Sequence, residues 1–168
     1  MLKIRPARPG DEALVSDLVR ELAEYEKLAH EAEATPADVA RALFSTAPKA
    51  FCDIAEWDGE PVGFALWFYN YSTFRGRHGI YLEDLFVRPA ARGKGAGKAL
   101  ITGLARRCVE QGLARLEWSV LDWNVSAIGF YEGLGATVMD DWRICRLTGE
   151  ALAAVGAQAE REPAEAGG

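Results

Sequence analysis

The chain has 168 residues, 49% of them hydrophobic and 26% charged, with a net charge of −6 at pH 7. This length and composition suit one globular domain with a sizeable core, and they exclude a disordered chain. The acidic balance argues against nucleic acid as a partner, and the longest apolar run, at residues 62–69, is too short to cross a membrane.

Apolar spacing predicts the helices. Leu14, Leu18 and Leu22 recur at four-residue intervals, which is typical of a helix that buries one face. A second helix begins after Thr35, whose side chain suits an N-cap, and runs to residue 44. A long amphipathic helix follows Gly97, a short one covers residues 126–134, and one or two turns cover residues 149–155.

Alternating apolar residues predict the strands. Residues 51–57 and 62–71 form a hairpin around Asp58 and Gly59, and residues 80–87 form a third long strand. Shorter strands are expected at residues 3–5, 116–120 and 142–147. This order predicts a mixed α/β (α+β) fold around one central sheet. We expect one domain over residues 1–155 and a flexible C-terminal tail over residues 156–168, which lack large apolar side chains.

The cysteines and histidines bear on cellular location and on metals. The three cysteines are odd in number and widely spaced, so we expect Cys52, Cys108 and Cys145 to be reduced, buried residues of a cytoplasmic protein. With only two histidines and no metal-ligand spacing, we expect no metal site.

A glycine-rich segment follows the third long strand and opens the long helix. Its glycines let backbone amides approach a pyrophosphate, and basic side chains add positive charge around it. A nucleotide-binding Walker loop is excluded because Ala99 follows Lys98, and the dinucleotide fingerprint fails because Lys98 stands where its third glycine belongs. A plain glycine-rich turn with a solvated basic rim would show the same short pattern. The segment consists of Arg92, Gly93, Lys94, Gly95, Ala96, Gly97 and Lys98.

Together with a second motif, this segment resembles the acetyl-CoA pyrophosphate loop of the GNAT superfamily of N-acetyltransferases. The second motif is Asn124, Phe130-Tyr131 and Gly135-Ala136, typical of that superfamily's last helix. The runs Glu-Leu-Ala-Glu-Tyr-Glu-Lys-Leu (21–28), Tyr-Leu-Glu-Asp (81–84) and Leu-Asp-Trp-Asn (121–124) are most similar to the diamine/thialysine, spermidine/spermine-type branch. The resemblance implies a central mixed, mostly antiparallel sheet flanked by helices, and a homodimer.

The resemblance also implies the chemistry. An amine with a pKa near 10 arrives protonated, and Glu83 would remove its proton through an ordered water. Tyr131 would protonate the departing thiolate. In a regular strand Glu83 and Asp84 point to opposite faces, so they would not share a proton. In the non-catalytic interpretation, Glu83 and Asp84 are surface or salt-bridged acids, and Tyr131 is an aromatic residue of the core.

The remaining assignments follow from the same resemblance. Asp140 stands where relatives carry a Glu in a longer loop, which leaves the acceptor open among a polyamine, a thialysine- or lysine-like amino acid and a protein lysine. A non-catalytic acyl-CoA-binding regulatory module is the rival interpretation. The acceptor-binding residues implied are Tyr25, Glu26, Glu83, Asp84, Asp140 and Trp142. The acetyl-CoA-binding residues implied are Leu85, Phe86, Val87, Asn124, Ser126, Ala127 and Tyr131, besides the loop from Arg92 to Lys98.

Overall fold

A five-stranded sheet forms the centre of the first part of the chain in the computed structural model, which describes residues 1–159. The chain divides into two compact units, Met1–Ser119 and a second that begins at Val120. Residues 160–168 of the expected tail lie outside the described residues.

The sheet carries its strands in chain order. These are β1 (Leu2–Pro6), β2 (Phe51–Trp57), β3 (Glu60–Ser72), β4 (Arg77–Val87) and β5 (Leu116–Trp118). Neighbouring strands are antiparallel except β4 and β5, which are parallel. The expected mixed, mostly antiparallel sheet is confirmed. Short turns join β2 to β3 and β3 to β4, which favours antiparallel neighbours, whereas α3 crosses over between the parallel strands β4 and β5.

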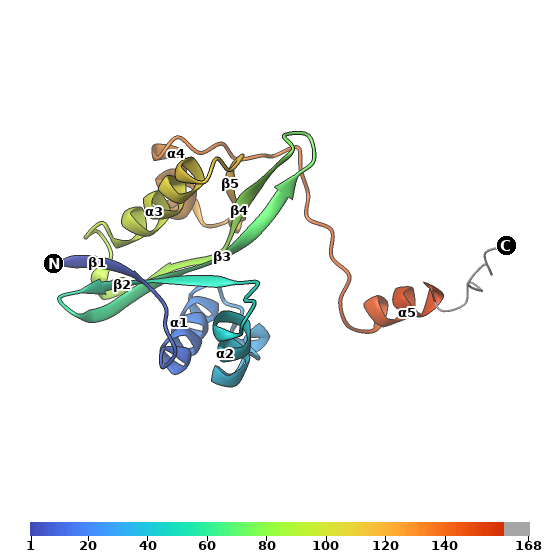
Figure 1. Cartoon of the computed structure of the whole chain (residues 1–168), viewed down its shortest axis with the longest axis horizontal. Helices are drawn as coiled ribbons and strands as arrows, with labels where there is room; N and C mark the ends of the chain where they lie inside the picture. Colours follow the sequence, from blue (N-terminus) through green and yellow to red (C-terminus); the bar gives the residue numbers. More distant parts are fainter. Residues whose placement is uncertain (160–168) are drawn as a thin grey trace. The chain divides into compact units, whose positions relative to one another are not determined.

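Helices cover both faces of this sheet. Helices α1 (Glu12–Tyr25) and α2 (Pro36–Phe44) pack on one face, and α3 (Ala96–Glu110) lies on the other (Figure 1). Leu18 and Leu22 of α1 join Ile54 and Phe64 of the sheet in a core that the spacing of the α1 leucines predicted. Thr35 caps α2 through a reciprocal capping box with Asp38, as predicted for the cap. Short 3-10 turns occur at Ala29–Glu31 and Pro89–Ala91.

A β-bulge interrupts β4. Leu66 of β3 pairs with Asp84 and Trp67 pairs with Leu82, which leaves Glu83 without a partner on β3. Leu66 packs against the core beneath α1, whereas Trp67 contacts α3. Since directly paired residues share a face, Asp84 lies on the α1 face and Leu82 on the α3 face. The regular alternation expected of this strand therefore does not hold at Glu83.

The second unit contains α4 (Val125–Gly133) and α5 (Gly149–Ala159). The expected strand at residues 142–147 is wrong: no strand of the described residues pairs with this segment, and Trp142 and Ile144 are exposed. Helix α5 continues past residue 155 to Ala159, where the composition suggested a tail, because its alanines have high helix propensity.

The cysteines differ in exposure. Cys52 and Cys108 are buried, but the expectation of a buried Cys145 is wrong, since this residue is exposed in the second unit. Burial raises the pKa of the Cys52 thiol to about 12 and also raises that of Cys108. Within residues 1–159, no helix combines the length and apolar character that crossing a membrane requires.

Candidate active site

The glycine loop takes a conformation that depends on its glycines. Gly93 and Gly95 have φ angles of 77° and 86°, in the left-handed region that other residues avoid. Gly95 is the N-cap of α3, which begins at Ala96. A Cβ on Gly97 would lie 3.7 Å from a methyl group of Val87, so the loop lies close against the end of β4.

The backbone N–H groups of residues 93–98 make no hydrogen bond within the described residues. Ala99 donates to the carbonyl of Gly95, whereas the amides of residues 93–98 bond to no other group among residues 1–159. Successive unpaired amides at a helix N-terminus form an anion-binding concavity. Lys94 and Lys98 are exposed beside it. A pyrophosphate fits this arrangement.

Two arginines flank the approach to the loop. Arg92 donates from Nε to the carbonyl of Val87 at 2.9 Å, and its guanidinium lies 4.6 Å from the ring centre of Tyr25. Arg88 forms a bidentate ion pair with Glu21 of α1, at 2.8 to 3.2 Å. No pattern in the sequence pointed to this pairing, because Glu21 and Arg88 lie 67 positions apart.

Three carboxylates gather near the bulge. Glu83 is exposed, while Asp84 is half-buried on the α1 face. Burial raises the pKa of Asp84 to about 7, and the neighbouring charges of Glu83 and then Glu26 act in the same direction. Burial also raises the pKa of Glu26, just after α1. The surroundings of Asp84 therefore disfavour a further negative charge, and a bound cation would be favoured there.

One edge of β4 is open beyond the bulge. Strand β5 pairs only with residues 80–82, so no strand of the described residues covers residues 83–87 on that side. The amide of Arg88 donates to Val62 of β3. By the alternation of antiparallel strands, the amide of Phe86 also faces β3, and those of Leu85 and Val87 face the open edge.

The second unit holds the remaining predicted residues. Asn124 caps α4, and its side-chain oxygen accepts the amide of Ala127 at 3.3 Å. Ser126 is exposed in the first turn of α4. Tyr131 is half-buried, with its ring 5.5 Å from that of Phe130.

Two acceptor candidates also lie in this unit, in the segment between α4 and α5. Asp140 and Trp142 are both exposed, and Trp142 has 77% of its surface accessible. The structure thus groups Glu26, Glu83 and Asp84 within the first unit, and it places Asp140 and Trp142 on the second.

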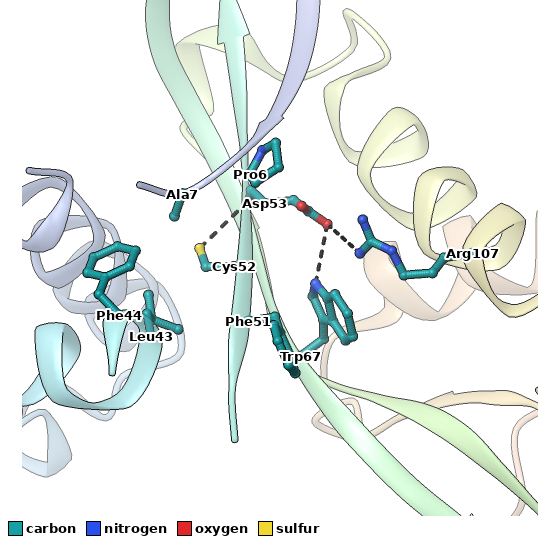
Figure 2. A pocket seen from close by; sticks show the side chains of 9 residues that line it. All are labelled: Pro6, Ala7, Leu43, Phe44, Phe51, Cys52, Asp53, Trp67 and Arg107. Carbon is teal, nitrogen blue, oxygen red and sulfur yellow. Dashed lines mark hydrogen bonds and ion pairs between the residues drawn. The ribbon is translucent and has the colours of Figure 1, made fainter. Parts of the chain in front are cut away.

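A pocket of about 220 Å³ lies elsewhere, where β1 ends (Figure 2). The Asp53 carboxylate accepts hydrogen bonds from Trp67 at 3.2 Å and from Arg107 at 3.4 Å. Burial raises the pKa of Asp53, and Arg107 opposes this shift. None of the predicted site residues lines this pocket. Its lining residues are Pro6, Ala7, Leu43, Phe44, Phe51, Cys52, Asp53, Trp67 and Arg107.

Comparisons with known proteins identify the family of the chain. The family model described as the acetyltransferase (GNAT) family matches residues 15–136. The chain is 35% identical to the L-ornithine N5-acetyltransferase of Arabidopsis thaliana, over 91% of this chain and 87% of that protein. It is 39% identical to the thialysine N-epsilon-acetyltransferase of Bos taurus, over 89% and 94%. An integron cassette protein of V. cholerae has a similar structure, with a TM-score of 0.77 and 26% identity over 92% and 97% of the chains.

Proposed function

The chain belongs to the acetyltransferase (GNAT) family, and from this premise we propose that it transfers an acetyl group from acetyl-CoA to a primary amine of a small cationic acceptor. The chain is an acyltransferase. Its relatives belong to the diamine/thialysine branch that its motifs predicted. The observation that carries the proposal is the row of unpaired amides at residues 93–98.

These amides are suited to the pyrophosphate of acetyl-CoA. Lys94 and Lys98 would add positive charge, and the α3 dipole would favour the anion. Along the open edge of β4, the amides of Leu85 and Val87 would bind the pantetheine arm and the thioester carbonyl. Asn124, Ser126 and Ala127 complete the proposed cofactor set. Acetyl-CoA supplies an acyl group already activated as a thioester.

The proposed reaction is direct attack. The acceptor ammonium loses one proton to Glu83 through a water, and its neutral nitrogen bonds to the thioester carbon. The nitrogen loses a second proton to water as the carbon–sulfur bond breaks, and Tyr131 gives its proton to the departing thiolate. Glu83 then releases its proton to solvent, and Tyr131 takes one up. No enzyme-bound acyl intermediate is needed. Burial raises the thiol pKa of Cys52 and Cys108, so neither supplies a thiolate at neutral pH.

The acceptor proposed is an amino acid of the thialysine, ornithine or lysine type, or a polyamine. Glu26, Glu83 and Asp84 together favour a cation, because the charges of Glu83 and Glu26 already disfavour the negative charge of Asp84. We include Tyr25, Asp140 and Trp142 in the acceptor site. The relatives named for ornithine and for thialysine both act on amino acids with a second amine, which supports this class.

We also propose that residues 1–155 work as one acetyltransferase domain. The family match runs from residue 15 to residue 136 and so crosses the boundary between the two units. The proposal further includes a homodimer and a cytoplasmic location, both on the strength of the resemblance.

The test is a coenzyme A release assay with matched acceptors. Thialysine, ornithine and spermidine should be acetylated with a higher kcat/KM than aniline, which carries no charge at neutral pH. A lysine-containing peptide tests the protein-lysine alternative. Coenzyme A binding without acetylation of any acceptor would support the non-catalytic module and reject the enzyme. Equal kcat/KM for aniline and thialysine would reject the anionic acceptor site.

A further inference from the structure

Helix α1 contacts the approach to the glycine loop at two points. Glu21 and Tyr25 are four residues apart and therefore share one face of the helix. Arg88 and Arg92, which they contact, flank the turn at Pro89–Ala91 directly before Gly93. Two contacts one helical turn apart fix both position and orientation, whereas a single contact would allow rotation about it.

The first contact anchors the turn on two elements. Arg88 donates three hydrogen bonds to the Glu21 carboxylate, between 2.8 and 3.2 Å. Its other terminal nitrogen donates to the carbonyl of Pro61 at 2.9 Å. Each side chain of the ion pair is 35% exposed, so water screens it only in part. The guanidinium thereby ties α1 to the start of β3.

The second contact lies at the entrance of the loop. The Arg92 guanidinium lies 4.6 Å from the ring centre of Tyr25 and 5.8 Å from that of Phe86. Its Nε donates to the carbonyl of Val87 at 2.9 Å. The residue just before Gly93 is therefore held between the end of α1 and the end of β4.

The loop needs such support. Gly93 and Gly95 adopt left-handed φ angles, but glycine permits this conformation without enforcing it. Helix α3 holds residues 95–98 through their carbonyls, as in the bond from Ala99 to Gly95, but the amides of residues 93 and 94 bond to no group among the described residues. Support has to come from the flanks.

We propose that Glu21 and Tyr25 are positioning residues which, through Arg88 and Arg92, hold the glycine loop in the conformation that presents its amides to coenzyme A. This inference rests on the proposed function, because it takes the loop as the coenzyme A site. It gives Tyr25 a role distinct from the acceptor contact, through its ring and not its hydroxyl group.

Coenzyme A binding by calorimetry tests the ring. Tyr25→Leu should raise the Kd for coenzyme A about two- to fivefold, since it removes an exposed cation–π contact. Tyr25→Phe keeps the ring over Arg92 and should leave this Kd at the wild-type value. An equal rise in both variants would overturn the role of the ring.

The ion pair is tested in the same way. Glu21→Gln preserves volume and helix propensity and should raise the Kd for coenzyme A about two- to tenfold, with kcat at saturating substrates unchanged. Glu24→Gln removes an exposed charge of the same helix, and the ion pair of Arg88 is with Glu21 and not with Glu24, so this variant serves as the matched control. Equal effects of Glu21→Gln and Glu24→Gln would assign the change to net charge and overturn the role of the pair.

A double variant tests whether Tyr25 acts through Arg92. Tyr25→Leu with Arg92→Leu should bind coenzyme A no more weakly than the weaker of the two single variants. If the two increases in the Kd for coenzyme A multiply in the double variant, Tyr25 and Arg92 act independently and Tyr25 does not act through Arg92. Wild-type protein that binds no coenzyme A would refute the proposed function and this inference together. Wild-type affinity in both Tyr25→Leu and Glu21→Gln would refute the positioning role alone.

Discussion

Asp84 lies directly opposite Leu66 on β3, whereas Leu82, which a regular strand would place on the same face as Asp84, lies on the other face of the sheet. The bulge at Glu83 thus separates Leu82 on the α3 face from the Asp84 carboxylate on the side that α1 covers, where Glu26 also lies. A carboxylate in that position is surrounded by apolar groups and like charge, and its pKa rises to about 7.

Asp84 should make stability depend on pH. Its pKa is about 7 in the folded chain and about 4 in the unfolded chain, so the folded state binds the extra proton between these values. The free energy of unfolding should therefore fall as pH rises from about 4 to about 7, by roughly 1–3 kcal/mol after allowance for water penetration. Asp84→Asn cannot titrate and should lose this slope. Urea denaturation at pH 5 and pH 8 measures it, and equal slopes in both proteins would contradict the assignment.

Glu83 should carry the proton transfer. Glu83→Gln is nearly isosteric and should lower kcat about 10²–10⁴-fold, as expected for loss of a general base, with little change in coenzyme A affinity. Asp84→Asn should act mainly on the KM of the acceptor. The pKa of Asp84, about 7, also suits a general base at neutral pH. A larger loss of kcat in Asp84→Asn than in Glu83→Gln would therefore transfer the role of base to Asp84.

The bulge marks a limit of what local sequence patterns can predict. The spacing of the leucines identified α1, and Thr35 identified the start of α2, because caps and apolar periods are local signals. A bulge adds one residue to a strand whose composition stays strand-like, so nothing in residues 77–87 marks it. It appears only once β3 sets the register. The Glu83 and Asp84 motif could be found from the sequence, but not the face on which Asp84 lies.

Gly95 should be required for its backbone angle. Gly95→Ala forces a non-glycine residue to φ near 86°, which should cost about 1–2 kcal/mol of stability and raise the KM for acetyl-CoA. Gly103 is an exposed glycine within α3, where an added methyl group would meet no atom beyond the helix's own backbone within 4 Å, and it provides the control. Gly103→Ala should stabilise the protein by about 0.5–1 kcal/mol and leave the KM unchanged. Unchanged acetyl-CoA affinity in Gly95→Ala would remove the loop from the proposal.

Tyr131 should contribute its hydroxyl group. Tyr131→Phe keeps the ring that lies beside Phe130, so the fold should survive. Loss of a general acid should lower kcat about a hundredfold, at the lower end of the usual range, because a thiol with a pKa near 8.5 leaves partly unaided. Single-turnover kinetics measures the chemical step. Wild-type rates in this variant would leave Tyr131 a packing residue.

The second unit was less predictable than the first. Asn124 was assigned to the cofactor by resemblance, and the structure adds a local role for it as the cap of α4. Alternating apolar residues suggested a strand at residues 142–147, but a strand forms only when a neighbour supplies its hydrogen bonds. The pairing of Glu21 with Arg88 could not be predicted for a related reason, since it depends on how α1 docks on the sheet.

The unequal exposure of the cysteines makes the chain a convenient subject for site-specific spectroscopy. A maleimide reagent reacts with accessible thiolates, so brief treatment of the native protein should label Cys145 and spare Cys52 and Cys108. A fluorophore introduced this way resides on the segment that also carries Trp142, whose indole is 77% exposed and lies three residues away. Quenching of that fluorophore would then follow the segment in real time as acceptor is added, without any engineered cysteine.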